Sequence, residues 1–148
     1  VHLWEEIRER GGAYGVPVRF EPIDGSVSFL SYRDPHLART VAAFRGASGF
    51  LRQPPSERDR RSSVIAAIGA RDRPLPPGEA AARALRRHLT GEDHAWRAER
   101  RAALLDADPR DFVQLAEALE AMEARIVAIG GAAALGEMAA GTIRRRLT

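Results

Sequence analysis

The chain opens with a helical pattern of apolar positions that ends at two glycines. Leu3 and Ile7 lie one helical turn apart with Trp4 beside them, so the first ten residues predict an amphipathic helix with a narrow apolar stripe. Gly11 and Gly12 follow. Because glycine adopts positive φ without steric penalty, this pair lets the backbone leave the helix sharply and turn back toward its last turn.

Tyr14 follows the two glycines, so this turn can bring its phenol close to Arg8 or Arg10. A guanidinium and a phenol held together at a helix end could both donate hydrogen bonds to a peptide carbonyl or a developing oxyanion. Two ordinary alternatives stay open. Arg8 could form a surface ion pair with an acid such as Glu5, and Tyr14 could be a core side chain in register with Val16.

A strict alternation of apolar and polar side chains then predicts a β-hairpin. Residues 16–20 have the period of a half-buried strand, although Pro17 has no N–H to give to a neighbouring strand. Asp24-Gly25 supplies turn chemistry, and residues 26–33 form a second run rich in strand-forming side chains.

Helical patterns occupy most of the remaining chain. Asp34-Pro35 and Ser56 are helix-start signals, because Asp and Ser side chains can accept an orphan N–H and proline at the first position sacrifices none. Further helices are predicted over residues 79–89, 92–105 and 109–122, and a short Ala-rich helix follows Gly131. Phe112, Leu115 and Leu119 mark the buried face of the helix over residues 109–122.

Residues 125–129 form a short apolar run closed by Gly130-Gly131, which predicts a buried strand. Strands near both ends with helices between them indicate an α+β fold. We expect a small, mainly antiparallel sheet, made of the N-terminal hairpin and this late strand, with several helices covering one face. The length of 148 residues suits a single domain over residues 1–148.

The amino-acid composition argues against several classes of site and partner. Without cysteine there is no disulfide framework and no thiolate, and we expect a cytoplasmic location. No apolar run approaches the length of a membrane span, so no membrane partner is expected. All 23 basic residues are arginine, but 20 acids are scattered among them, which favours solvated faces over a nucleic-acid partner. The basic clusters are Arg58, Arg60 and Arg61; Arg86 and Arg87; Arg97, Arg100 and Arg101; and Arg144, Arg145 and Arg146.

The histidines do not form a metal motif. His88 and His94 lie either side of a helix break with Glu92 and Asp93 between them, but this spacing matches no zinc pattern, and neither H-E-x-x-H nor H-x-x-E-H occurs. The Gly-x-Ser-x-Gly motif of serine hydrolases is also absent. We therefore expect no metal site in this chain.

Two segments in the same order and at the same separation resemble the pitrilysin/insulinase-type zinc metallopeptidases, and look most like the presequence protease branch. They are Leu-Trp-Glu-Glu-Ile-Arg-Glu-Arg-Gly-Gly-Ala-Tyr-Gly at residues 3–15 and Phe-Leu-Ser-Tyr-Arg-Asp-Pro at residues 29–35. In that family, homologous LuxS/pitrilysin-like halves close around a chamber. The N-terminal half holds zinc through H-x-x-E-H and a distal glutamate. The C-terminal half contributes an arginine and a tyrosine that flank the Gly-Gly turn.

The resemblance implies roles for two residues. Arg8 would hold a backbone carbonyl of the bound peptide, and Tyr14 would donate a hydrogen bond to the scissile carbonyl and its oxyanion. It also implies that the chain is a fragment, truncated at its N-terminal side. It would be the substrate-binding C-terminal domain of a zinc-dependent metalloendopeptidase that degrades unfolded peptides. The partner would be the zinc-bearing N-terminal half of the same polypeptide, so this chain alone would be inactive.

A sheet that lacks its preceding strands leaves an unpaired edge, so self-association of the isolated chain is also expected. Two other functions remain open. One is a non-catalytic peptidase-like subunit or protein-interaction module. The other is an arginine-rich nucleic-acid binder, which would associate with DNA or RNA in a strongly salt-dependent way.

Overall fold

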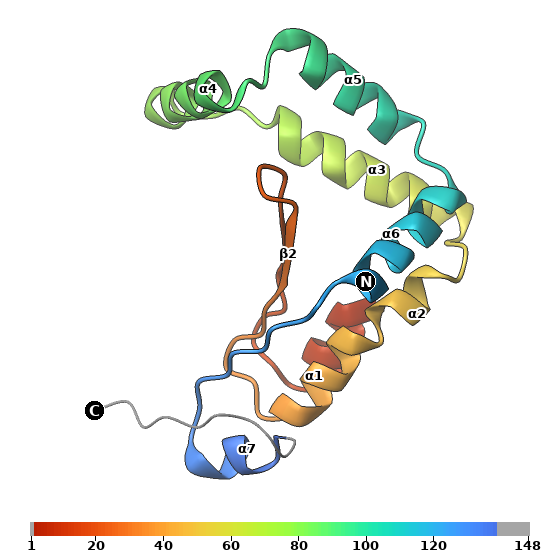
Figure 1. Cartoon of the computed structure of the whole chain (residues 1–148), viewed down its shortest axis with the longest axis vertical. Coiled ribbons are helices and arrows are strands. Elements are labelled where there is room, and N and C mark those ends of the chain that lie inside the picture. Colours follow the sequence, from red (N-terminus) through yellow and green to blue (C-terminus); the bar gives the residue numbers. More distant parts are fainter. Residues whose placement is uncertain (1, 139–148) are drawn as a thin grey trace. The chain divides into compact units, whose positions relative to one another are not determined.

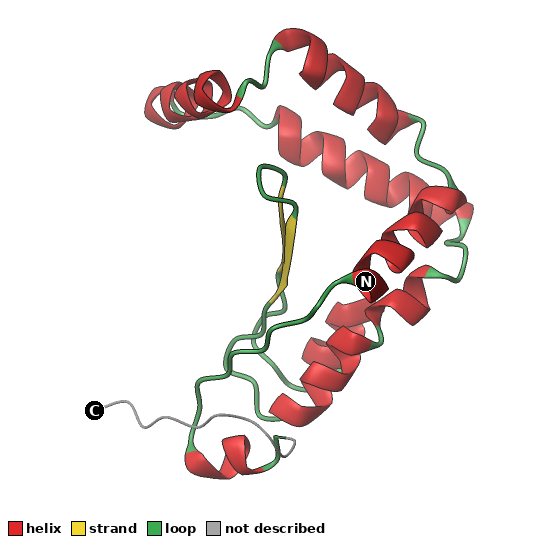
Figure 2. Ribbon diagram, in the orientation of Figure 1, coloured by secondary structure: helices red, strands yellow, loops and turns green. Residues whose placement is uncertain are grey.

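The computed structural model describes residues 2–138 and divides into two units (Figures 1 and 2). The first unit comprises Val1–Phe50 and Ala116–Thr148, and the second comprises Leu51–Leu115. The first unit carries η1 (Trp4–Glu9), β1 (Val18–Glu21), β2 (Ser26–Phe29), α1 (Leu37–Arg45) and α7 (Ala132–Gly136), and α2 (Ala47–Leu51) ends at the first residue of the second unit. The second carries α3 (Glu57–Asp72), α4 (Pro77–Thr90) and α5 (His94–Leu105), and α6 (Pro109–Ala121) runs from the second unit into the first.

The described chain is thus mostly helical with one small antiparallel sheet, which confirms the α+β class. The expectation of a single domain stays a prediction.

The opening helix ends at the two glycines as predicted, but it is wound as a π-helix. The Arg10 N–H donates to the Glu5 carbonyl at 2.9 Å, five residues back rather than four. Gly12 has a φ of +76°, and a Cβ at Gly11 would collide with the carbonyl oxygen of Ile7. Because neither glycine tolerates a side chain easily, both are needed for the sharp exit from η1.

The hairpin forms in the predicted place and is less buried than predicted. Val18 pairs with Phe29 and Glu21 with Ser26, so β2 ends at Phe29 rather than at residue 33. Val18 and Phe20 are 51% and 60% exposed, which corrects the expectation of a half-buried strand. Alternation reports which side chains share a face, but only a covering layer buries that face.

The predicted late strand is wrong. Residues 123–131 are neither helix nor strand, and Val127 and Ile129 are 89% and 78% exposed. A strand is stabilised by a neighbouring strand that accepts its hydrogen bonds, and within residues 2–138 no strand pairs with this run. The short Ala-rich helix that should follow is present as α7, with Gly131 at its N-cap.

The core of the first unit is built from small side chains around one larger residue. Ile7 is 2% exposed, and α1 packs against η1. The other buried side chains of this unit are Ala13, Thr40, Ala47 and Ala116. Small residues let backbones approach closely. A ring contact between Phe29 and Phe44, with centroids 5.4 Å apart, joins β2 to α1.

In the second unit, α3 and α5 lie side by side (Figure 1). Ser56 caps α3 as predicted, since its Oγ accepts the Asp59 N–H at 3.1 Å. Asp93 caps α5 by accepting the Trp96 N–H at 2.8 Å. Among residues 51–115, all of which the structure describes, none is fully buried. This unit therefore presents much of its apolar surface to solvent.

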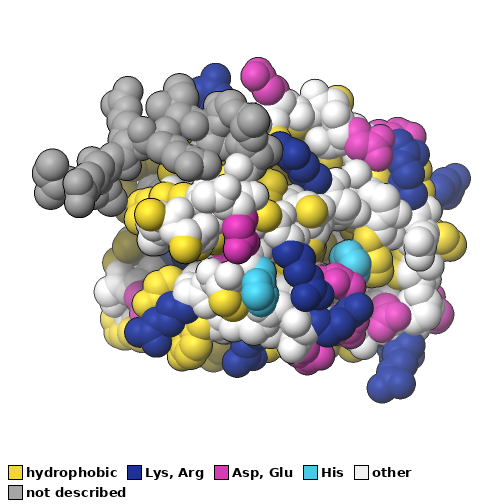
Figure 3. Space-filling model, turned by 90° about the horizontal axis from the view of Figure 1, so that it is seen from below, with side chains coloured by type: hydrophobic (Ala, Val, Ile, Leu, Met, Phe, Trp, Pro, Cys, Tyr) yellow, Lys and Arg dark blue, Asp and Glu magenta, His cyan; other side chains and the backbone are white. Residues whose placement is uncertain are grey.

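The helix α6 buries part of its predicted apolar face. On α6, Ala116 is fully buried and Phe112 and Leu119 are half-buried, but Leu115 is 44% exposed, so the predicted buried face is confirmed at two of its three positions. On the face drawn in Figure 3, apolar side chains reach the surface in patches among arginines and acids. In the described part of the chain, no helix has the length and apolar character needed to cross a bilayer. The predicted basic cluster at Arg144, Arg145 and Arg146 lies outside the described residues.

Candidate functional site

The Gly-Gly turn fixes the backbone around Tyr14. The Ala13 N–H donates to the Ile7 carbonyl at 3.1 Å, which returns the chain to the last turn of η1. The Tyr14 N–H then donates to the Tyr32 carbonyl at 3.0 Å, and the Tyr32 N–H donates to the Gly15 carbonyl at 3.1 Å. These two bonds tie the exit of the helix to the exit of the hairpin.

Tyr14 is a surface side chain. It is 65% exposed, and its ring lies edge-on to that of Tyr32, with centroids 6.0 Å apart and planes at 81°. The alternative that Tyr14 packs in the core is therefore wrong. An exposed phenol on an anchored backbone can donate a hydrogen bond to a molecule bound from solvent.

Arg8 and Arg10 differ in their partners. The Arg8 guanidinium lies 4.1 Å from the centre of the Trp4 ring, one turn earlier on η1. Arg10 instead forms an ion pair with Glu6, with 2.6 Å between nitrogen and oxygen. A guanidinium stacked on a ring keeps its in-plane N–H donors available. Arg10 is thus engaged by a carboxylate and Arg8 by a ring, and the substrate-binding role of Arg8 stays a prediction.

The contacts that the structure gives to Arg8 and to Tyr14 are with different partners. Arg8 lies on Trp4, whereas the rings and cations around Tyr14 are Tyr32 and Arg33. The structure does not bring Arg8 and Tyr14 into contact, and their joint role in a site stays a prediction.

Sequence reasoning missed Arg33. The sequence pattern gives Arg33 no role beyond its place in the segment at residues 29–35. In the structure its guanidinium lies 5.7 Å from the centre of the Tyr14 ring and 5.4 Å from that of Tyr32. Its φ is +49°, a left-handed conformation that arginine seldom adopts. The sequence offers one weak signal, which is that Arg33 stands where the hairpin ends and the Asp34-Pro35 turn begins.

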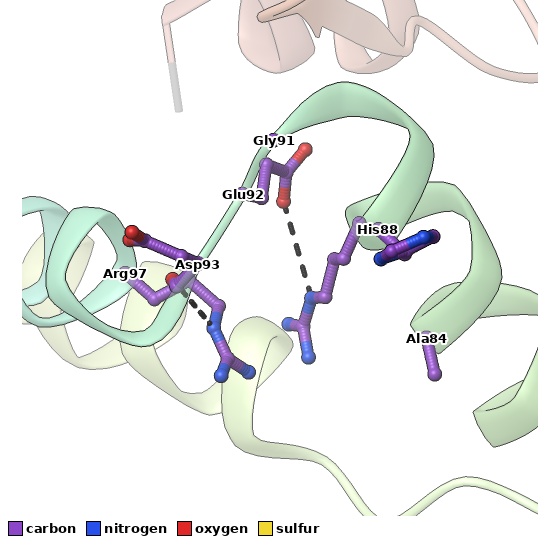
Figure 4. A pocket seen from close by; sticks show the side chains of 7 residues that line it. Ala84, His88, Gly91, Glu92, Asp93 and Arg97 are labelled. Atoms are coloured by element: carbon purple, nitrogen blue, oxygen red, sulfur yellow. Dashed lines mark hydrogen bonds and ion pairs between the residues drawn. The ribbon is translucent and has the colours of Figure 1, made fainter.

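A second cluster lines an open hollow of about 540 Å³ at the junction of α4 and α5 (Figure 4). Its lining residues are Ala84, Arg87, His88, Gly91, Glu92, Asp93 and Arg97. The Arg87 Nε lies 3.9 Å from the Glu92 carboxylate, and the Arg97 Nε donates to the Asp93 carbonyl at 3.1 Å. Burial, followed by the like charges of Arg97 and Arg83, lowers the pKa of Arg87, while Glu92 opposes this shift. At this junction only Glu92 lies near an arginine as a carboxylate, since the Asp93 carboxylate caps α5.

No metal centre is visible among residues 2–138, because no three His, Asp or Glu side chains in that range converge as ligands. His94 is not part of the hollow's lining, although His88, Glu92 and Asp93 are. A zinc ion needs at least three protein ligands. The described residues therefore do not fit a zinc site.

A family model described as the PreP C-terminal domain matches residues 1–131. The chain belongs to this family. The resemblance to presequence proteases inferred from residues 3–15 and 29–35 is thereby confirmed. The chain is a peptidase-related C-terminal domain.

Curated relatives of this chain support the same family. Presequence protease 1, chloroplastic/mitochondrial, of Arabidopsis thaliana is 33% identical over 133 residues, which cover 89% of this chain and 12% of that protein. The mitochondrial presequence protease of Kluyveromyces lactis is 31% identical over 132 residues, covering 88% of this chain and 13% of that protein. The mitochondrial presequence protease of Danio rerio is 33% identical over 115 residues, covering 77% and 11%. The chain thus spans about an eighth of the length of these relatives.

These names correct one expectation. The relatives are called chloroplastic or mitochondrial, so they point to an organelle and contradict a cytoplasmic location. The expectation rested on the absence of cysteine, which is equally compatible with reducing compartments inside organelles.

Proposed function

We propose that this chain is the substrate-binding C-terminal domain of a zinc-dependent metalloendopeptidase that degrades unfolded peptides, and that it is inactive alone. The single observation that carries the proposal is the Gly-Gly turn, which presents an exposed Tyr14 on a backbone held by two hydrogen bonds to the hairpin exit. The names of the relatives support a peptidase as the parent protein.

Tyr14 would act at the reacting carbonyl. Its hydroxyl would donate a hydrogen bond to the scissile carbonyl oxygen, where negative charge grows as the tetrahedral species forms. A donor placed at that oxygen stabilises the transition state more than the ground state. The anchored backbone supports this role, because a donor that is already oriented requires no reorganisation during the reaction.

Arg8 would bind rather than react. With one face of its guanidinium on Trp4, it can donate in-plane hydrogen bonds to a backbone carbonyl of the peptide. Backbone carbonyls occur in every peptide, so this contact would hold substrates of different sequence. That property suits an enzyme that degrades unfolded chains.

Zinc belongs to the proposal only through the parent protein. Residues 2–138 contain no set of ligands for it, so the metal would be held by the N-terminal half of the same polypeptide, which is this chain's proposed partner. When bound there, zinc would supply a Lewis acid and an activated water molecule. This chain would hold the peptide through Arg8 and stabilise the oxyanion through Tyr14, and it would supply no metal ligand from residues 2–138.

The test is to determine the natural polypeptide upstream of Val1 and to assay it beside the 148-residue chain. We expect an H-x-x-E-H motif, chelator-sensitive cleavage of an unfolded peptide by the full polypeptide, and no cleavage by the chain alone. A polypeptide that binds peptides but lacks the motif and cleaves nothing would contradict the proposal. That outcome would establish the alternative, a non-catalytic peptidase-like module.

A further inference from the structure

Arg33 occupies a conformation that its side chain does not favour. It has a φ of +49°, and among residues 2–138 it is the one residue other than glycine with positive φ. Left-handed backbone costs conformational energy for a residue with a Cβ, and such residues gather at sites where the surroundings over-determine them. A glycine or asparagine would relieve this cost, so the arginine side chain itself requires an explanation.

The Arg33 guanidinium lies near two exposed rings. Its centre is 5.7 Å from the Tyr14 ring and 5.4 Å from the Tyr32 ring, both within the range of a cation–π contact. Tyr14 and Tyr32 are 65% and 57% exposed and are joined by the backbone hydrogen bonds of the Gly-Gly turn. The cation is therefore placed at the surface beside the Tyr14 phenol.

No acid of the described chain neutralises this cation. In the described part of the chain, no ion pair is formed by Arg33, whereas Arg10, Arg39 and Arg60 each have a glutamate partner. The adjacent carboxylate, Asp34, is used differently, since its Oδ1 accepts the His36 N–H at 2.9 Å. The N–H donors of the Arg33 guanidinium thus remain available for an external acceptor.

We propose that Arg33 binds a carboxylate of the bound peptide, either an acidic side chain or the free C-terminal carboxylate. The planar guanidinium fork matches a carboxylate with two parallel hydrogen bonds. Its place beside Tyr14 puts this carboxylate close to the carbonyl that Tyr14 would polarise. The inference rests on the proposed function and adds a specificity-determining residue to it.

The test measures peptide affinity for the full polypeptide by fluorescence anisotropy. Three peptides of one sequence are compared: one with a glutamate and a free C-terminus, one with glutamine in place of glutamate, and one with an amidated C-terminus. The variant is Arg33→Asn, because asparagine accepts left-handed backbone and lacks the cation. Arg33→Gly serves as the second variant should the first not fold. Arg19→Asn is the matched control, since Arg19 is another exposed arginine of the same hairpin.

We expect Arg33→Asn to weaken binding of the peptide with both carboxylates by about tenfold, as for loss of a charged hydrogen-bonded contact at a surface. One of the two neutralised peptides should be insensitive to the variant, and that peptide identifies the carboxylate that is bound. Arg33→Lys should recover only part of the affinity, because an ammonium cannot form the two parallel bonds. Arg19→Asn should leave all three affinities unchanged.

Equal weakening by Arg33→Asn and Arg19→Asn would overturn the inference, since it would show a general effect of net charge. Equal weakening for all three peptides would also overturn it, because it would show a structural role. Peptide hydrolysis is measured separately. Carboxylate-selective binding without hydrolysis would refute the peptidase and leave the Arg33 site standing. Hydrolysis with no carboxylate-selective effect of Arg33→Asn on binding would support the peptidase and refute the Arg33 site.

Discussion

Gly12 determines where the chain goes after η1, and therefore where Tyr14 lies. Its φ of +76° is strained for any residue with a Cβ. We predict that Gly12→Ala lowers the free energy of unfolding by about 1–2 kcal/mol. Gly15→Ala is the matched control, because a Cβ there meets no atom within 4 Å and should change stability little. Urea denaturation of both variants measures the difference, and equal stabilities would contradict the strain argument.

Tyr14→Phe removes one hydroxyl and keeps the ring contact with Tyr32. If that hydroxyl donates to the oxyanion, kcat of the full polypeptide should fall by about 10²–10³-fold, while KM should change much less. Steady-state kinetics on one peptide substrate measures both. The control is the melting temperature, which should be unchanged because the side chain is 65% exposed. An unchanged kcat would remove Tyr14 from the chemistry and leave it a binding role at most.

At the scale of elements, local signals predicted most helices, although α1 begins at Leu37 with His36 at its N-cap and not at Asp34-Pro35. Ser56 and the Gly-Gly pair act within a few residues of themselves, so their effects can be predicted from the sequence, and the structure confirms both. The strand predicted at residues 125–129 is wrong, because a strand depends on a partner that no local pattern specifies. Arg33 was missed for a related reason. Positive φ at a residue other than glycine is imposed by the chain around it.

We expect Asp108 to give the start of α6 a pH dependence. Its carboxylate accepts hydrogen bonds from the Arg110 side chain, at 2.9 Å for Nη2, and from the Arg110 backbone N–H, and these contacts lower the pKa of Asp108. A carboxyl whose pKa is lower in the folded state stabilises the fold above its unfolded pKa. That contribution is lost as the pH falls through the folded value.

We therefore expect Asp108→Asn to be destabilised relative to the wild type at pH 7, with a difference that shrinks as the pH falls below about 4. Urea denaturation between neutral pH and pH 2.5 measures it. Asp106→Asn is the control, since Asp106 is a nearby exposed carboxylate that makes none of these contacts with Arg110. A difference that stays constant with pH would show that the asparagine perturbs the helix start in some other way.

At the scale of the whole molecule, the chain leaves large apolar side chains uncovered. Val18 and Phe20 on β1 are more than half exposed, and so are Ile65 on α3 and Val127. The hairpin has two strands, so each strand also has an edge with unpaired backbone groups. An exposed apolar edge is a template for pairing with another chain. The chain covers 12% of its Arabidopsis relative, and in the proposed longer polypeptide we expect other segments to cover this edge.

The isolated chain should therefore self-associate through the hairpin. Sedimentation velocity over a range of concentrations should show a shift from monomer to larger species, and the double variant Val18→Lys, Phe20→Lys should reduce it, because charge on an edge strand opposes pairing. Ile65→Lys is the control: it replaces an equally exposed apolar side chain, 63% exposed, on a helix of the other unit. If Ile65→Lys reduced association as much as the hairpin variant, the driving force would be apolar surface in general and not the strand edge. A monomer at every concentration would show that the uncovered hairpin is stable in water without a partner.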